Sequence, residues 1–241
     1  MTTLFISDLH LQASRPDITA QFVEFLGTRA RDAEALYILG DLFEAWIGDD
    51  DPDAHNRQVI AALRACVDQG TPGYFMRGNR DFLVGERFAE ETGFTLLEDP
   101  TVITVNGQRV LVMHGDTLCT DDVEYQAFRR MVREPAWQAQ MLALPVEQRR
   151  QLAAQARDAS SAASQQKAAD IMDVNHDAVT GAIAEAGVDI LLHGHTHRPA
   201  VHAVDVDGRA CTRIVLGDWY EHGSMVRWDA DGYELMALPR A

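Results

Sequence analysis

Six short apolar runs recur along this chain, and most of them end at a cluster of polar side chains. Runs of three to five residues rich in Leu, Ile, Val and Phe are typical of buried strands rather than helices. Between these runs, apolar residues recur at the spacing of a helix, as in Ile18–Arg31, where Phe22, Phe25 and Leu26 repeat on one face. This alternation predicts parallel strands joined by helices. The runs are Thr3–Ile6, Ala35–Leu39, Gly73–Met76, Val110–Met113, Asp189–Leu192 and Ile214–Leu216.

The second half of the chain carries a different signal. Asn106-Gly107, Asp207-Gly208 and Asp231-Gly232 each stand between apolar flanks. Asn-Gly and Asp-Gly are the strongest short-range indication of a β-hairpin, because both central residues of its turn need a positive φ. The sheets are therefore expected to be mixed. We expect an α/β fold in which two sheets pack as a sandwich.

One segment, residues 122–170, differs from its surroundings. Phe128, Met131, Trp137, Met141 and Leu152 recur in it at helix-like spacing, and residues 125–170 hold seven basic and four acidic side chains. The whole chain has a net charge of −16, so this segment has the opposite bias. We predict a helical cap inserted at residues 122–170 into a core made of residues 1–121 and 171–241. The alternative is that the apolar stripe belongs to an ordinary core.

Composition excludes several classes of protein. A net charge of −16 argues against a nucleic-acid binder, since phosphate backbones reward clustered Lys and Arg. No apolar run approaches the roughly 20 residues of a membrane span, and the start lacks the basic region of a signal peptide. Three widely spaced cysteines, Cys66, Cys119 and Cys211, indicate free thiols. We expect a cytoplasmic location and no obligate protein partner.

Polar clusters follow five of the strands. Each cluster contains Asp, His or both, and four of the five contain Gly. Ligand sites of open α/β sheets lie at the carboxyl ends of their strands. Alone, an Asp-x-His or a Gly-Asp is common and usually marks a turn. Together, all five are expected to meet at one place. They are Asp8-Leu9-His10, Gly40-Asp41, Gly78-Asn79-Arg80-Asp81, His114-Gly115-Asp116 and His193-Gly194-His195-Thr196-His197.

These side chains are suited to metal ions. Mixed Asp, Asn and His ligation favours Mn²⁺, Fe²⁺ or Zn²⁺ over Ca²⁺. Seven ligands are too many for one ion and suit two that share a carboxylate, an arrangement that activates water and stabilises a phosphoryl transition state. His193 is interpreted as structural. The seven predicted ligands are Asp8, His10, Asp41, Asn79, His114, His195 and His197.

The order D-x-H, GD, GN, H and GHxH resembles the calcineurin-like metallophosphoesterase family, from one end of the chain to the other. The resemblance implies an α/β/β/α sandwich with a binuclear metal centre. It assigns one metal to Asp8, His10, Asp41 and His197. It assigns the other to Asp41, Asn79, His114 and His195.

One position departs from the broad family, which usually has histidine after the Gly-Asn. Here it is Arg80, which cannot give up a proton at working pH. A phosphate leaving group needs no acid, and Arg80 offers a bidentate fork for a second phosphate. The substitution favours a pyrophosphate substrate. The alternative is that Arg80 only pairs with Asp81 or another acid.

Longer motifs narrow the resemblance to family members that hydrolyse UDP-2,3-diacylglucosamine in lipid A synthesis. These motifs span residues 38–50, 78–82, 114–122 and 171–175. The resemblance implies two Mn²⁺ ions and attack of metal-activated water on the α-phosphorus, which yields UMP and 2,3-diacylglucosamine 1-phosphate. Ser164 stands where these members usually have asparagine. Implied catalytic residues are Asn79, Arg80, His114 and His195, and implied substrate contacts are Asn79, Arg80, Asp122, Ser160, Ser164, Lys167 and His195.

A substrate with two acyl chains needs an apolar groove, which the predicted cap would provide. Its Met, Leu and Trp side chains would line a groove for acyl chains, while Lys167 and the arginines would face phosphates or anionic headgroups. We expect peripheral association with the cytoplasmic face of the inner membrane. Two alternatives are another dimetal phosphoesterase and a metal-less scaffold on the same fold. Arg80 and the cap argue against the first, and the full ligand set argues against the second.

Overall fold

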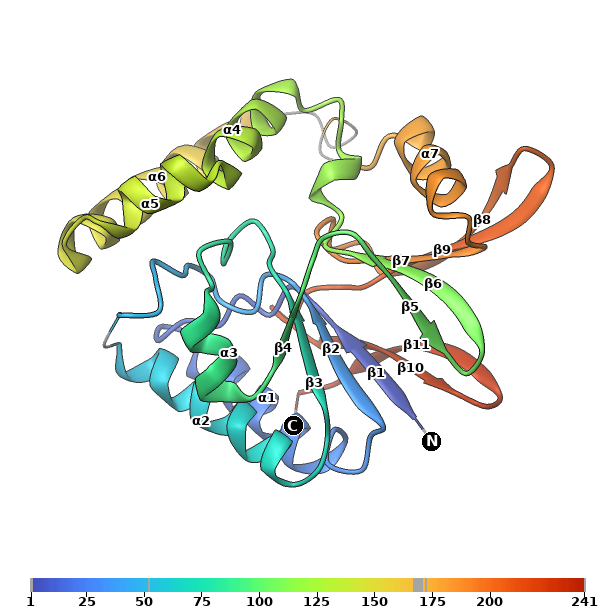
Figure 1. Cartoon of the computed structure of the whole chain (residues 1–241), viewed down its shortest axis with the longest axis horizontal. Coiled ribbons are helices and arrows are strands. Elements are labelled where there is room, and N and C mark those ends of the chain that lie inside the picture. The colour runs from blue at the N-terminus through green and yellow to red at the C-terminus, as the bar shows by residue number, and fades with distance from the viewer. Residues whose placement is uncertain (1, 52, 167–170, 172, 241) are drawn as a thin grey trace.

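Two β-sheets form the centre of the computed structural model, which describes residues 2–51, 53–166, 171 and 173–240, with the backbone alone for residues 160–166 (Figure 1). The first sheet has the strand order β11-β10-β1-β2-β3-β4. Strands β1 to β4 run parallel, and β10 and β11 continue the sheet antiparallel to β1. The strands are β1 (Thr3–Ile6), β2 (Ala35–Leu39), β3 (Gly73–Met76), β4 (Thr95–Leu97), β10 (Gly223–Asp229) and β11 (Gly232–Leu238).

The second sheet has the order β5-β6-β7-β9-β8. Its three central strands are parallel, and hairpins add an antiparallel strand at each edge. Asn106 and Asp207 have the positive φ angles that their hairpin turns require, so the predicted hairpins and mixed sheets are confirmed. The strands are β5 (Thr101–Val105), β6 (Gln108–Met113), β7 (Ile190–His193), β8 (Ala200–Val206) and β9 (Arg209–Val215).

Helices cover the outer faces of both sheets. Because side chains alternate along a strand, Leu4 and Ile6 of β1 pack against the helices while Phe5 packs between the sheets. Helix α7 (His176–Ala186) packs Val179 and Ile183 onto the second sheet. The predicted α/β/β/α sandwich is therefore confirmed. The helices on the first sheet are α1 (Pro16–Thr28), α2 (Ala54–Asp68) and α3 (Glu86–Thr92).

A short 3-10 turn, Asp116–Leu118, leads from β6 into three further helices, α4 (Val123–Arg133), α5 (Pro135–Leu142) and α6 (Val146–Gln166). They lie together as a separate layer above the sheets (Figure 1). Helices thus form in the region where the sequence predicts an insertion. We refer to residues 123–166 as the helical segment.

Arginines hold this segment on the core. The guanidinium of Arg149 is buried, donates to the Asp50 carboxylate at 2.5 and 2.7 Å, and donates to Ile47 O at 2.6 Å. Arg150 donates to Asp51 at 2.5 Å. The expectation that the arginines of this segment face phosphates or headgroups is wrong for these two. The positive segment instead neutralises acids of the negative core.

No described helix combines the length and the apolar character that crossing a membrane requires.

Candidate metal centre and adjoining cavity

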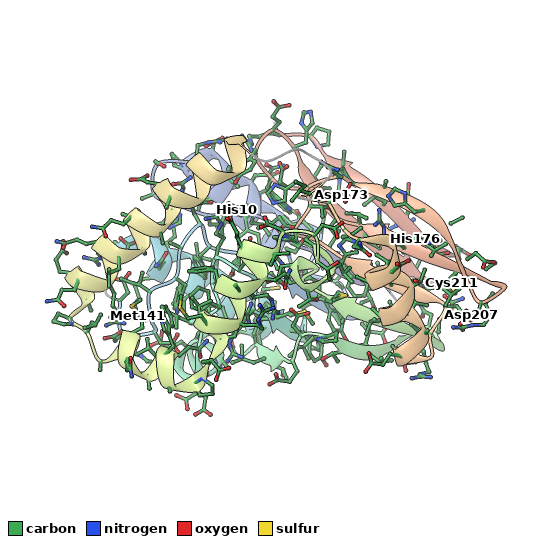
Figure 2. All side chains as sticks on the ribbon, turned by 90° about the horizontal axis from the view of Figure 1, so that it is seen from above. His10, Met141, Asp173, His176, Asp207 and Cys211 are labelled. Carbon is green, nitrogen blue, oxygen red and sulfur yellow. The ribbon has the colours of Figure 1, made fainter. Side chains whose placement is uncertain are left out.

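The loops that follow β1, β2, β3, β6 and β7 converge at one edge of the two sheets. Asp8, His10, Asp41, His195 and His197 all have positive φ angles, between 51° and 68°. The other two non-glycine residues with positive φ, among those the structure describes, lie in hairpin turns. Such backbone conformations cost free energy and persist where the surroundings enforce them, so their concentration here marks a functional site. Seen from above, His10 lies in projection between the ribbons of α4 and α6 (Figure 2).

Three predicted ligands form the first group. The Nε2 atoms of His10 and His197 face each other at 3.2 Å. Asp8 Oδ1 lies 3.4 Å from His197 Nε2 and, although buried, has no hydrogen-bond partner among the described residues. A buried carboxylate oxygen without a donor is costly, and a cation at this point would satisfy it.

Asp41 lies between this group and the next. Its Oδ2 is 3.8 Å from His10 Nε2, and its Oδ1 is 3.7 Å from His114 Nε2. Each oxygen of one buried carboxylate therefore faces a different histidine. This is the geometry that a carboxylate shared by two cations requires.

Asn79 brings the second group together. Its side-chain oxygen lies 2.9 Å from His114 Nε2 and 2.8 Å from His195 Nδ1. The other ring nitrogen of His114 is 2.9 Å from Leu39 O, to which it donates, so that Nε2 is oriented toward the site. All seven predicted ligands thus lie in one cluster. His193, interpreted as structural, is buried with Nδ1 2.8 Å from Gly194 O.

At two glycines, the backbone passes so close to a ligand carboxylate that no side chain fits there. A methyl group at Gly78 would overlap the Asp41 carboxylate, and one at Gly194 would overlap the Asp8 carboxylate. Gly78 and its neighbours are further fixed by buried Asp81, which accepts from the N–H groups of Gly78 and Leu42, both at 2.7 Å. Asp81 is therefore engaged by the backbone. The alternative that Arg80 merely pairs with it is not supported.

Two carboxylates stand behind the histidines of the first group. Glu44 Oε2 lies 2.8 Å from His10 Nδ1, and Asp218 Oδ2 lies 3.5 Å from His197 Nδ1. Carboxylates at this position orient ligating imidazoles and raise their basicity. The other oxygen of Glu44 is 2.5 Å from Arg157 of α6, which connects the helical segment to this side of the cluster.

Helix α4 connects to the other side. Tyr125 and Arg129 both donate to Asp116 Oδ2 at 2.7 Å, and Arg133 donates to Gly78 O at 2.8 Å. These three residues are four apart and share one helix face. The Tyr125 ring also stacks on His195, with 5.9 Å between ring centroids. The face of α4 thus contacts the loops that carry His114, His195 and Asn79.

The histidines differ in their affinity for protons. Burial, aided by the positive charge of His114, lowers the pKa of His195 to about 4. Burial would also lower the pKa of His114, but Asp41, Asp116 and Asp8 outweigh it and raise that pKa to about 9. Burial would also lower the pKa of His197, but the neighbouring Asp8 carboxylate outweighs this effect and raises that pKa. Without a cation, the carboxylates therefore hold a proton on His114 at neutral pH and favour the protonated form of His197.

A cavity of about 420 Å³ opens between the cluster and the helical segment. Its polar lining includes Asn79, which belongs to the cluster, and Arg80 and Glu44. Buried Nε of Arg80 has no hydrogen-bond partner among the described residues. The remaining wall is largely apolar and comes from both the core and the helices: Ala45, Trp46, Ile47, Phe82, Leu83, Phe128, Trp137, Met141, Leu152, Ala153, Ala156 and Ala159.

Beyond Asn79, Arg80 and His195, the predicted substrate contacts are Asp122, Ser160, Ser164 and Lys167. Asp122 lines the cavity and caps α4 by accepting from Tyr125 N at 3.0 Å. Ser160 and Ser164 lie in α6, whose backbone alone is described there, and Lys167 lies outside the described residues. Four side chains of the predicted apolar stripe line the cavity, namely Phe128, Trp137, Met141 and Leu152, whereas Met131 does not. Met141 also packs against the core beneath the first sheet.

The donor set fits divalent cations. Five imidazole or carboxylate ligands converge as Asp8, His10 and His197 and as Asp8, Asp41 and His114, each group with atoms within 4.8 Å of one another. Asn79 and His195 complete the second group with a neutral oxygen and an imidazole. This chemistry suits Mn²⁺, Fe²⁺ or Zn²⁺.

Comparison with known proteins agrees with this geometry. Residues 1–199 match the sequence model of the calcineurin-like phosphoesterase family. The chain belongs to this family. The family implies a dimetal centre, and the converging side chains provide its candidate ligands.

Curated relatives match almost the whole chain. A protein of Xanthomonas oryzae pv. oryzae (strain PXO99A) is 55% identical over 242 residues, 98% of each chain, and one of Escherichia coli O7:K1 is 55% identical over 239 residues, 99% of this chain and all of its own. Both are named UDP-2,3-diacylglucosamine hydrolase. The solved structure of an archaeal phosphodiesterase aligns over 99% of this chain with a TM-score of 0.50 at 13% identity, a likeness of fold.

Several residues of the site are not among the predicted ligands or substrate contacts. Glu44, Asp218 and Tyr220 contact the histidines, and Asp116 and Arg129 hold α4 in place. Asp116 belongs to the polar cluster His114-Gly115-Asp116, and Glu44 lies in the motif at residues 38–50, so both had a sequence signal. Asp218 follows the sixth apolar run within Gly217-Asp218, the same pair as Gly40-Asp41 after β2, and this pair is a signal for it.

We predict that metal binding releases protons. Cations bind neutral imidazole, whereas His114 holds a proton at pH 7 because its pKa is raised to about 9. Titration of metal-stripped protein with Mn²⁺ by calorimetry, in two buffers of different ionisation enthalpy, should show release of at least about one proton per protein at pH 7. Affinity should rise between pH 6 and 9. Binding without proton release would contradict this electrostatic description.

Proposed function

We propose that this protein hydrolyses the pyrophosphate bond of UDP-2,3-diacylglucosamine to UMP and 2,3-diacylglucosamine 1-phosphate, a step of lipid A synthesis. The observation that carries the proposal is the cavity in which Asn79 and Arg80 adjoin a long apolar wall. A substrate that joins a pyrophosphate to two acyl chains needs both surfaces side by side. The names of the full-length relatives support the same substrate.

Two Mn²⁺ ions are the proposed cofactors, held by Asp8, His10, Asp41 and His197 and by Asp41, Asn79, His114 and His195. When bound, such ions lower the pKa of a water molecule and neutralise charge on phosphate oxygens. The chain itself supplies the positions of these ligands. Glu44 and Asp218 orient His10 and His197, and Leu39 O orients His114.

Arg80 acts on the substrate. Its buried Nε lacks a hydrogen-bond partner among the described residues, so the guanidinium has a donor for a phosphate oxygen. A charged donor of fixed shape can hold the β-phosphate while the α-phosphorus is attacked. A phosphate leaving group, with a second pKa of about 6, needs no proton from this residue. Asp122, Ser160, Ser164 and Lys167 are proposed to contact the sugar and phosphate.

Hydrolysis of UDP-2,3-diacylglucosamine in ¹⁸O-water tests the proposal. Metal-stripped protein should be inactive, and Mn²⁺ should restore release of UMP that carries the label. His10→Ala should abolish turnover with the fold retained by circular dichroism, while the exposed surface variant Arg87→Ala serves as control. Cleavage of a simple phosphodiester with no action on this substrate would favour another dimetal phosphoesterase.

Arg80→Ala should slow hydrolysis of the pyrophosphate substrate much more than hydrolysis of a simple phosphodiester. Loss of one preorganised donor typically costs about 10²- to 10³-fold in rate, and the loss is expected on UDP-2,3-diacylglucosamine. Hydrolysis of bis(p-nitrophenyl) phosphate, which has no second phosphate, should fall less than about fivefold. Equal losses on both substrates would show that Arg80 serves the cluster and not a second phosphate.

We further propose that the enzyme is cytoplasmic and associates with the inner membrane through the helical segment. Met131 and Leu142 are large apolar side chains that are 47% and 42% exposed, and neither lines the cavity. Val123, Phe128 and Leu152 of the same segment are also exposed. Arg149 and Arg150 are paired with acids of the core, and the whole chain has a net charge of −16. Contact between the exposed apolar side chains and the lipid must therefore provide much of the attraction to the membrane.

Flotation with vesicles of phosphatidylethanolamine and phosphatidylglycerol tests this association. The intact protein should float with the vesicles, and the double variant Met131→Ser/Leu142→Ser should reduce the bound fraction several-fold. Val201→Ser, at an exposed apolar position of β8, is the matched control. An intact protein that never floats with the lipid would refute membrane association.

A further inference from the structure

A second cavity, of about 410 Å³, has no role in the function proposed above. Its wall comes from the loop between β9 and β10 and from the adjoining strands, and includes Asp218, Tyr220, Glu221, His222 and Ala237. Its volume falls within the range of small-molecule sites. No described residue lines both this cavity and the apolar one beneath the helical segment.

The second cavity adjoins the metal cluster directly. The Tyr220 ring stacks on His10, with 5.3 Å between centroids and 21° between planes, and meets His197 edge-on at 5.8 Å. Asp218, also in the wall, lies 3.5 Å from His197 Nδ1. Glu44, in the wall of the apolar cavity, approaches the same His10 at Nδ1. The two cavities therefore reach the cluster through different residues.

We propose that this second cavity binds the nucleoside half of the substrate, a pyrimidine ribonucleoside. The inference rests on the proposed function. A pyrophosphate that is cleaved at the cluster has two halves, and the apolar cavity suits the diacylated one. The other half must leave the cluster along a different surface, and the second cavity provides one.

The chemistry of the wall matches a nucleoside. Tyr220 is 37% exposed, so its ring offers surface on which a base can stack. The carboxylates of Asp218 and Glu221 can accept hydrogen bonds from ribose hydroxyls, as acidic residues do in dinucleotide sites. The same negative charge disfavours a phosphate or an anionic lipid headgroup here. The uncharged end of the nucleotide is thus the part that fits.

Binding of UMP and of methyl phosphate to the Mn²⁺-loaded protein tests the proposal by calorimetry. Both carry the phosphate, but only UMP can fill the second cavity. Stacking of one base on an aromatic side chain predicts that UMP binds about five- to 150-fold more tightly than methyl phosphate. Methyl phosphate also reports any damage to the cluster.

Two variants locate the effect. Tyr220→Ala removes the ring, and Ala237→Trp fills the cavity from an exposed position of β11. Each should reduce the ratio of the UMP affinity to the methyl phosphate affinity to nearly one. Ala210→Trp, at an exposed position of β9 outside the cavity, should leave the ratio unchanged.

Equal affinity of the intact protein for UMP and methyl phosphate would overturn the proposal, as would a ratio that neither cavity variant changes. These outcomes are separable from failure of the proposed function. If the intact protein hydrolyses UDP-2,3-diacylglucosamine but does not prefer UMP, the nucleoside site alone is wrong. If it prefers UMP through this cavity but leaves that lipid intact, the nucleoside site stands and the lipid substrate is wrong.

Discussion

The Asp41 carboxylate, with one oxygen toward His10 and the other toward His114, is the interaction on which the rest of the site depends. A buried carboxylate is stable only if its surroundings supply donors or cations. The backbone N–H of Arg80 donates to its Oδ1 at 2.8 Å, and the absence of a side chain at Gly78 leaves room for that loop. Asp81 then fixes the two loops to each other through their N–H groups. Two strand exits are thereby joined at a single carboxylate.

Carboxylates that receive charged donors also hold the helical segment on the core. A core rich in acids and a segment rich in arginines are complementary, and Asp50, Asp51, Glu44 and Asp116 each receive an arginine. Two of these acids also border the cluster, Glu44 beside His10 and Asp116 two residues after His114. The position of the helices and the orientation of the ligands are therefore coupled. A wall of the apolar cavity and the cluster at its end are held by one network.

Much of this could be predicted from the sequence, because the signals were local. The strands and their polar exits, the Asn-Gly and Asp-Gly turns, and the seven side chains now gathered at the cluster all depend on neighbours in the chain. The partners of the arginines could not be predicted, since Arg157 and Glu44 are 113 residues apart and many acids were available. Charge bias alone suggested lipid headgroups for the arginines. The structure shows that Arg149 and Arg150 serve the fold.

The second cavity illustrates the same limit. Tyr220 carries no motif, and its contacts with His10 and His197 arise only because β10 pairs with β1 and brings the preceding loop to the strand exit. Long-range pairing of this kind determines what surrounds a cluster, whereas local motifs determine what is in it.

Anomalous diffraction from crystals soaked in Mn²⁺ tests the central claim most directly. The account predicts two peaks, one on each side of the Asp41 carboxylate, with the first contacting Asp8, His10 and His197 and the second contacting Asn79, His114 and His195. Asp41→Ala should remove or displace at least one of them. A single peak in the intact protein, or two that do not share Asp41, would contradict it.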